Sequence, residues 1–297
     1  MDQRTEIEKN IKHDGLEKFL LDQGIDQEAI DTSKEEIAQK EKLEYKFYYD
    51  DTGKTAENIQ IPVSQIKGVS RISGYSWFKL LEYSLLGVPS FIPLGSFNLN
   101  KVSFLNWVAK LAKTSLQNIN EIYQKADTLE FSCYEKNGIK EYYGINDGNH
   151  RTITAKIYGL QELPARRVNY YVFNDAKYQE FQLYKKQKKE AEQLLTSLGL
   201  FVDELDFIIF KGQDVYIRVA EFPFEEVYRP VSEMIQEMDQ VKTMLQRVYK
   251  KADLYQKLYQ HFPTKLRKIV YYFAENSDSN QLEKRLSKLI ALNNLYK

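Results

Sequence analysis

The sequence is poor in several residue types that mark particular protein classes. It has one cysteine, Cys133, which excludes an internal disulfide, and three scattered histidines without a second cysteine, which give no zinc pattern. These features fit a reducing cytoplasm, where we expect the protein to lie. No apolar run approaches the length of a membrane span, and the N-terminus lacks the apolar core of a signal peptide. We therefore expect no membrane contact.

Glycine and proline are also scarce, at 13 and 7 of 297 residues, and neither sign of charge is in excess, with 42 basic and 42 acidic side chains. Balanced charge excludes a global field that would draw the protein onto nucleic acid, so any such contact needs a local patch. Abundant lysine, glutamate and leucine favour a helix-rich α+β protein. Most of the 22 tyrosines are expected to pack in the interior.

The clearest local pattern lies in residues 141–164. An aromatic, strand-forming run ends at Asn146-Asp147-Gly148, and apolar residues then recur until Gly159 and Pro164 end the pattern. This order predicts a strand, a tight turn and a short helix. Asn146 and Asp147 can accept hydrogen bonds from the first amides of the helix, and Gly148 lets the backbone approach a ligand closely.

The start of this predicted helix is suited to an anion. Helix amides and the positive end of the helix dipole supply roughly half a charge, and Arg151 adds a full, permanently protonated one beside them. Phosphate is the natural occupant of such a position. The structural alternative is a capped helix with a buried His150 and a surface Arg151.

The same residues carry a resemblance. Asp147-Gly-Asn-His-Arg151, followed by Ala155 and the run 159–165, resembles the Asp-Gly-x-His-Arg and Gly-x-x-Arg-x-x-x-Ala signature of the ParB/sulfiredoxin-like superfamily. Upstream, Ile59–Ile66 resembles the first strand of that domain. The resemblance covers residues 56–175 and implies a nucleotide-binding, mixed α/β core.

The elements between the first strand and the motif keep the order that is typical of the superfamily. Apolar residues at helical spacing predict a helix that includes residues 104–111. Alternating runs at 129–134 and 139–145 flank Asn137-Gly138, a strong hairpin signal. Residues 166–173 are expected to form the last strand of the sheet. Near the start of the core, residues 50–54 carry a turn signal, which we place between two strands.

The resemblance also implies roles for individual residues. Arg151 is expected to hold the charge of the β- or γ-phosphate, and His150 to donate to phosphate or shuttle a proton, while Asp147 orients the loop or holds Mg²⁺. The backbone amides of Gly148 and Asn149 are expected to bind non-bridging oxygens. Three residues of this motif, Asp147, His150 and Arg151, are thus the candidate catalytic residues, and the ligand would be ATP or CTP with Mg²⁺.

Further phosphate contacts are expected from Thr152 and from the loop after the first strand. That loop offers hydroxyls and cations, and in the superfamily it returns to the nucleotide site. Its candidate contacts are Lys67, Ser70 and Arg71. A flexible basic loop without a ligand is the alternative interpretation.

Regions outside this core are predicted to be mainly helical. Residues 1–55 are expected to form an N-terminal arm with two short amphipathic helices, and residues 176–297 a C-terminal domain. The latter begins with a charged helix that ends near Gly199. A hairpin of 207–210 with 215–219 and helices over 224–250, 253–274 and 279–295 are expected to follow. Their apolar stripes are typical of a bundle core or of the seam of a homodimer.

Superfamily activities can be separated by their residues. Asn149 occupies the position of the reactive cysteine of sulfiredoxin, which argues against thiol repair. Partition proteins of the superfamily carry a second conserved motif with asparagine, glutamine and arginine, and this motif has no clear counterpart after residue 175. Chromosome partition is therefore not expected. Serine kinases of the group carry a general-base acid soon after the first strand, whereas residues 67–74 contain none and Glu82 is the nearest.

A nucleoside-triphosphate hydrolase or phosphotransferase is therefore the expected function. One alternative is a non-enzymatic regulatory protein of a bacterial or phage mobile element, with a degenerate nucleotide site and a helical C-terminal domain that engages DNA or protein. The second alternative is a small-molecule kinase that acts on free serine.

Overall fold

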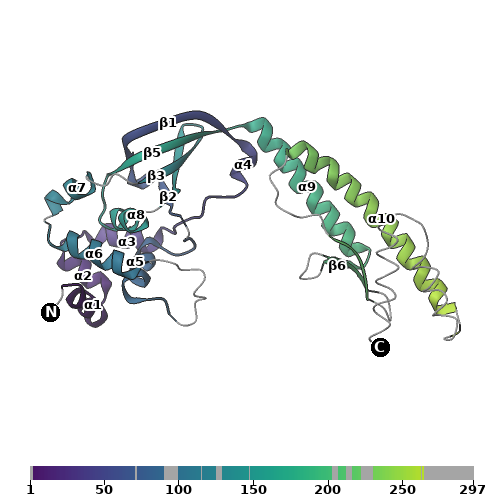
Figure 1. Cartoon of the computed structure of the whole chain (residues 1–297), viewed down its shortest axis with the longest axis horizontal. Helices are drawn as coiled ribbons and strands as arrows, with labels where there is room; N and C mark the ends of the chain where they lie inside the picture. Colours follow the sequence, from purple (N-terminus) through teal and green to yellow (C-terminus); the bar gives the residue numbers. More distant parts are fainter. Residues whose placement is uncertain are drawn as a thin grey trace. The chain divides into compact units, whose positions relative to one another are not determined.

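The computed structural model describes residues 3–70, 72–89, 100–114, 116–124, 129–146, 148–202, 207–211, 216–221, 230–261 and 263. The chain divides into two compact units, Met1–Asp175 and Ala176–Lys297. Both helices and strands occur in each unit, so the fold is α+β, as the composition predicts (Figure 1).

The first unit is built on a mixed five-stranded sheet of order β1-β5-β3-β4-β2. Neighbouring strands are antiparallel in the pairs β1–β5 and β3–β4 and parallel in the pairs β3–β5 and β2–β4. The strands are β1 (Tyr49–Pro62), β2 (Ile66–Gly68), β3 (Glu130–Lys136), β4 (Ile139–Gly144) and β5 (Glu162–Phe173).

Two turn predictions in this sheet have different outcomes. The Asn-Gly hairpin between β3 and β4 is confirmed, with φ of 51° at Asn137 and 78° at Gly138, as a two-residue turn requires. The turn predicted at residues 50–54 is wrong, because β1 continues through it. The Asp51 carboxylate accepts a hydrogen bond from the Gly53 amide at 2.8 Å, and the backbone bulges between Asp51 and Thr55. Strand β5 pairs with β1 both before and after this bulge.

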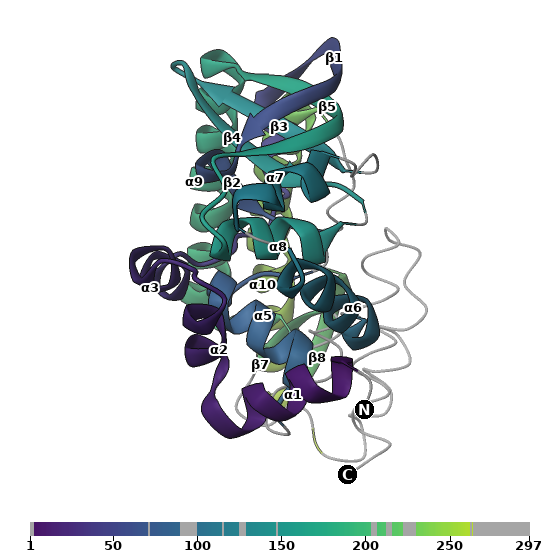
Figure 2. The ribbon, with the colours of Figure 1, turned by 90° about the vertical axis from the view of Figure 1, so that its left-hand side faces the viewer.

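Apart from the short α4, the helices of the first unit gather on one side of this sheet, as Figures 1 and 2 show from two directions. Two helices were predicted in the N-terminal arm, residues 1–55, and the described residues of that arm form four. Ile11, Leu20 and Ile30, from the first three of them, pack in the same core as Trp77 and Phe131. The helices are α1 (Gln3–Asp14), α2 (Leu16–Asp22), α3 (Gln27–Glu35), the short α4 (Tyr45–Tyr48), α5 (Trp77–Leu86), α6 (Lys101–Ala112), α7 (Leu116–Gln124) and α8 (Asn149–Ile157).

The opposite face of the sheet carries a cluster of tyrosines. Cys133 lies in the core on the helical side, so its neighbour Tyr134 in β3 points to the other face. There its ring lies 4.7 Å from that of Tyr45 in α4 and stacks on Tyr171 at 5.0 Å. Burial raises the pKa of Tyr45 to about 12. These tyrosines pack, as expected.

The second unit begins with α9 (Asp175–Ser197), which ends before Gly199 with φ of 68°. Its strands β6 (Leu200–Val202), β7 (Phe207–Lys211) and β8 (Tyr216–Glu221) form an antiparallel sheet, which confirms the predicted hairpin. One helix, α10 (Val231–His261), spans the break predicted at residues 250–253, because no helix-breaking residue occurs there. The predicted helix 279–295 lies outside the described residues.

None of the helices within the described ranges is both long and apolar enough to cross a membrane.

Candidate functional site

The strand and the helix predicted on either side of residues 146–148 are confirmed. Strand β4 ends at Gly144, and α8 begins at Asn149 directly after Gly148. Gly148 has φ of 117° and ψ of 7°, in the left-handed region that favours glycine. A Cβ atom here would lie 2.1 Å from Cδ2 of Leu129. The backbone conformation therefore favours glycine at this position, and a larger residue would also force the Leu129 side chain to shift.

Capping of α8 differs from the prediction. Gly148 is the N-cap residue, and no side chain caps the helix there. The Gly148 carbonyl accepts the amides of Arg151 and Thr152 at 3.0 and 3.1 Å. The side-chain NH₂ group of Asn146 donates to the Glu130 carboxylate at 2.6 Å, so this carboxylate holds the Asn146 side chain in place. Asp147 lies outside the described residues.

Part of the loop after β2 reaches the start of α8, as predicted. The Ser70 hydroxyl lies 2.8 Å from the Asn146 carbonyl oxygen and 3.2 Å from Oδ1 of Asn149, so it can donate to either. In return, the Asn149 side-chain amide donates to the Ser70 carbonyl at 3.1 Å. Ser70, Gly148 and Asn149 are thus brought together, and Arg71 lies outside the described residues.

Lys67 lies elsewhere. Its ammonium is 3.9 Å from Glu36 and 3.5 Å from the carbonyl oxygen of Ser64. Glu36 in turn pairs with Lys156 in the last turn of α8, so Lys67 lies near the C-terminal end of this helix. The structure separates Lys67 from the predicted phosphate contacts at the other end.

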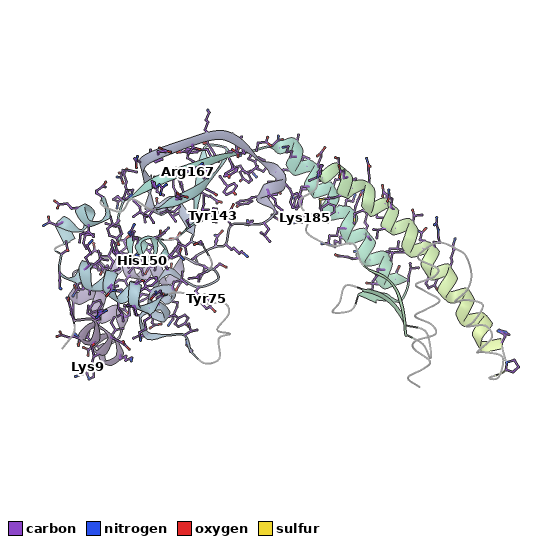
Figure 3. The ribbon with its side chains drawn as sticks, viewed as in Figure 1. Lys9, Tyr75, Tyr143, His150, Arg167 and Lys185 are labelled. Carbon is purple, nitrogen blue, oxygen red and sulfur yellow. The ribbon has the colours of Figure 1, made fainter. Side chains whose placement is uncertain are left out.

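His150 and Arg151 both face α6. The His150 ring packs edge-on against Phe104 and Trp107, with ring centroids 5.8 and 5.5 Å apart, and it lies in the helical layer (Figure 3). The Arg151 guanidinium lies 5.5 Å from the centre of the Trp107 ring, within cation–π range. Both side chains are half-buried. Thr152 is buried at 2 % exposure, with its hydroxyl in the interior.

A buried hydrogen-bond junction fixes α8 against α6 and α7. The Thr154 hydroxyl lies 2.6 Å from the His150 carbonyl, 2.9 Å from the Trp107 indole nitrogen and 2.7 Å from the Tyr123 hydroxyl. One assignment satisfies all three contacts: Thr154 donates to His150 and accepts from Trp107 and Tyr123. Burial raises the pKa of Tyr123. The junction thereby sets His150 and Arg151 beside Trp107.

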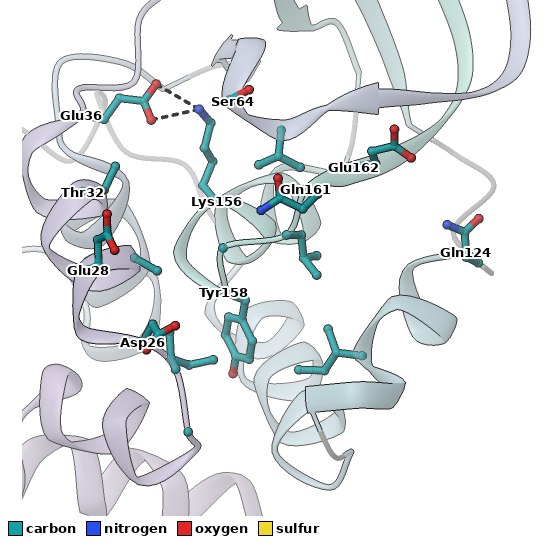
Figure 4. Close-up of a pocket in the computed structure, with 17 residues that line it drawn as sticks. Asp26, Glu28, Thr32, Glu36, Ser64, Gln124, Lys156, Tyr158, Gln161 and Glu162 are labelled. Carbon is teal, nitrogen blue, oxygen red and sulfur yellow. Dashed lines mark hydrogen bonds and ion pairs between the residues drawn. The ribbon is translucent and has the colours of Figure 1, made fainter.

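The C-terminal end of α8 borders a pocket of about 900 Å³, which we call the α8 C-terminal pocket (Figure 4). Its walls come from α3, α7, the end of α8 and the start of β5, and neither His150 nor Arg151 lines it. Lys156 reaches across to α3, with its ammonium 2.9 Å from both carboxylate oxygens of Glu36. Burial lowers the pKa of Lys156, and the Glu36 carboxylate opposes this shift.

This pocket was not predicted from the sequence. Lys156 lies in the last turn of a short helix, where a lysine side chain is usually exposed to solvent. Its partner Glu36 lies 120 residues away, at the end of a different helix. No local pattern links the two residues.

Metal ligands were predicted at Asp147 only. In the part of the chain that the structure describes, no three His, Cys, Asp or Glu side chains gather closely enough to hold a metal ion. Mg²⁺ is commonly held by one or two carboxylates together with substrate phosphates, so the donor set of Asp147 and a triphosphate fits that ion.

Comparison with protein-family models, with curated proteins and with solved structures finds no match for this chain. The assignment of function therefore depends on the motif and on the geometry of the site.

Proposed function

We propose that the chain binds a nucleoside triphosphate with its phosphates at the start of α8, and that it hydrolyses or transfers the terminal phosphate there. The observation that carries the proposal is the backbone at Gly148. Its left-handed conformation, which favours glycine, directs the chain into α8, and the first amides of a helix are suited to bind an anion.

The hydrogen bonds between Ser70 and Asn149 support this proposal. They tie the loop after β2 to the first residue of α8, so that the backbone around Gly148 is held from two directions. A preorganised backbone loses little conformational freedom when the ligand binds. The order of strand, helices, hairpin, motif and closing strand also agrees with the proposed ParB/sulfiredoxin-like core.

Arg151 supplies the main positive charge in this proposal. Its guanidinium lies 5.5 Å from the centre of the Trp107 ring, and a guanidinium is the side-chain group best suited to bidentate contact with phosphate. His150 would donate to the same phosphate or move a proton, and the amides of Gly148 and Asn149 would hold non-bridging oxygens. Asp147 would hold Mg²⁺, which neutralises charge on the triphosphate.

The free-serine kinase remains an alternative with a specific requirement. It needs a carboxylate free to take the proton of the serine hydroxyl. Glu82, the nearest acid after the first strand in sequence, is paired with Lys79 at 2.5 Å within α5. A phosphate hydrolase, in which water is the acceptor, has no such requirement for Glu82 and is the function we favour.

The test is to incubate the purified full-length chain with ATP, CTP, GTP or UTP and Mg²⁺ and to measure released phosphate. Parallel samples with free serine distinguish phosphate transfer, and samples with DNA distinguish DNA-dependent turnover. Arg151→Ala should abolish the activity, whereas Arg167→Ala, which removes an exposed arginine of β5, should leave it unchanged. Binding without turnover in every sample would favour the regulatory alternative. Failure of wild-type protein to bind any of the four nucleotides would refute the proposal.

A further inference from the structure

Three basic side chains meet around one buried aromatic ring, that of Trp107. The His150 ring centroid lies 5.5 Å from that of Trp107, and the Arg151 guanidinium lies 5.5 Å from the same ring centre. The third is Lys110, in the last turn of α6, whose ammonium is 5.3 Å from this centre. Lys110 therefore stands beside the two side chains to which the proposed function assigns the phosphates, although it comes from a different helix.

The Trp107 ring is a fixed reference point for these groups. Its indole N–H donates to the Thr154 hydroxyl at 2.9 Å, and Tyr123 packs against it edge-on with ring centroids 5.3 Å apart. The ring cannot turn without breaking these buried contacts. Because the Lys110 ammonium and the Arg151 guanidinium both lie near its centre, the two cations are no farther apart than the sum of their distances from it.

The charge of Lys110 is not neutralised by a carboxylate. Lys101, at the start of the same helix, is paired with Glu8 at 2.9 Å. The Lys110 side chain is exposed, and among the residues that the structure describes no carboxylate lies within ion-pair distance of its ammonium. The Trp107 ring attracts each neighbouring cation, but like charges repel, so an anion that contacts both Lys110 and Arg151 is favoured.

We propose that Lys110 is a further phosphate-binding residue of the nucleotide site and that it contacts a second phosphate of the triphosphate. This assignment rests on the proposed function, because it takes the phosphates to lie at the start of α8. The first amides of that helix and Arg151 hold one phosphate, and the Lys110 ammonium, which extends from α6, holds the next. A nucleoside monophosphate has no second phosphate, so Lys110 makes the site selective for polyphosphates.

Isothermal titration calorimetry on the full chain tests this assignment. The probes are ATP, CTP, GTP and UTP, each with Mg²⁺, and the four corresponding monophosphates. Lys110→Met removes the ammonium and keeps an unbranched apolar side chain beside Trp107. It should weaken triphosphate binding about tenfold or more, the usual effect of losing a contact from a charged group, and change monophosphate binding by less than about twofold.

Two further variants control for charge and position. Lys140→Met removes an ammonium that also lies over an aromatic ring, 5.8 Å from the centre of Tyr170, but on strand β4 of the sheet. It should bind triphosphates like wild type. Lys110→Arg keeps a positive charge at the site and should bind triphosphates within about threefold of wild type, because a guanidinium also pairs with phosphate.

A purely structural role of Lys110 gives a different result. A lysine in the last turn of a helix is favoured by the helix dipole, and this role alone would lower the melting temperature of Lys110→Met without changing triphosphate affinity. Equal triphosphate affinities of wild type and Lys110→Met, or equal losses in Lys110→Met and Lys140→Met, would overturn the assignment of Lys110 and leave the proposed function standing. Failure of wild type to bind any of the four triphosphates would instead refute the proposed function, and the role of Lys110 with it.

Discussion

Replacing Thr154 by valine tests the junction that fixes α8 in place. Valine has nearly the same shape as threonine, so the change removes the hydroxyl and leaves the packing of this fully buried position almost intact. The Trp107 indole N–H and the Tyr123 hydroxyl, both buried, then lose their shared acceptor. The perturbation is therefore confined to hydrogen bonding.

The expected cost follows from the number of groups left without a partner. A buried donor that loses its acceptor costs about 1–3 kcal/mol, so two donors give a loss of about 2–6 kcal/mol in the free energy of unfolding. Thr154→Ser keeps the hydroxyl and loses one methyl group, which should cost about 1 kcal/mol. Valine should thus be clearly more damaging than serine, although serine creates the larger cavity.

Urea unfolding followed by tryptophan fluorescence measures the difference in stability between the valine and serine variants, in the structural unit that contains Thr154. The chain has two tryptophans, Trp77 and Trp107, and both lie in the unit Met1–Asp175. A double-mutant cycle isolates the hydrogen bond between Thr154 and Tyr123. Once Thr154→Val is present, Tyr123→Phe should cost less than it does in wild type, by about 1–2 kcal/mol, because no acceptor remains to be lost.

Two results would refute this account of the junction. Equal stabilities of the valine and serine variants would show that the hydroxyl accepts no buried hydrogen bond of consequence. Strict additivity in the cycle would show that the Thr154 and Tyr123 hydroxyls do not interact, contrary to their separation of 2.7 Å.

Three further predictions concern other parts of the first unit. Gly148→Ala should lower the free energy of unfolding by about 2–5 kcal/mol, because the new side chain adds left-handed backbone strain and a contact of 2.1 Å to Leu129. If Gly148→Ala were as stable as wild type in urea unfolding, the backbone geometry at this position would be contradicted. Glu36→Gln should lower the free energy of unfolding by about 2–3 kcal/mol, less than the loss of a fully buried pair would, because Glu36 is 30 % exposed. Adding Lys156→Met should restore stability, because it removes the buried charge left without a partner. An unchanged stability of Glu36→Gln would refute the ion pair. Stability should fall as pH rises from 10 towards 12, because unfolded tyrosine ionises near 10 while burial holds the folded pKa of Tyr45 at about 12, so that the folded state retains the proton. In urea unfolding, Tyr45→Phe should lose less stability over this range than wild type, and an equal loss would contradict the contribution of Tyr45.

Local signals predicted the elements whose geometry is set by a few adjacent residues. Asn137-Gly138 specifies its own turn, and Gly148 marks the change from strand to helix, because only glycine readily adopts the backbone angles found there. The α+β class follows from similar local patterns. The turn at residues 50–54 was mispredicted because Asp51 and Gly53 form a bulge when a long partner strand is present, and local sequence does not reveal that partner.

The parts that sequence did not predict depend on residues far apart in the chain. No local pattern distinguishes Thr154 from other helix hydroxyls, and its buried role appears only when α6 and α7 bring Trp107 and Tyr123 to it. Likewise, Lys156 is buried because Glu36 lies across from it. Long-range pairs of this kind are set by tertiary packing, which leaves no periodic pattern in one sequence.

The most direct test of the proposed nucleotide site is the shift in melting temperature that ATP or CTP causes in wild type and in Arg151→Ala. Loss of one charged phosphate contact should weaken binding by about 1.5–3 kcal/mol, so the shift should shrink or vanish in Arg151→Ala and persist in the Arg167→Ala control. A shift of the same size in wild type and Arg151→Ala would contradict the assignment of the phosphates to the start of α8.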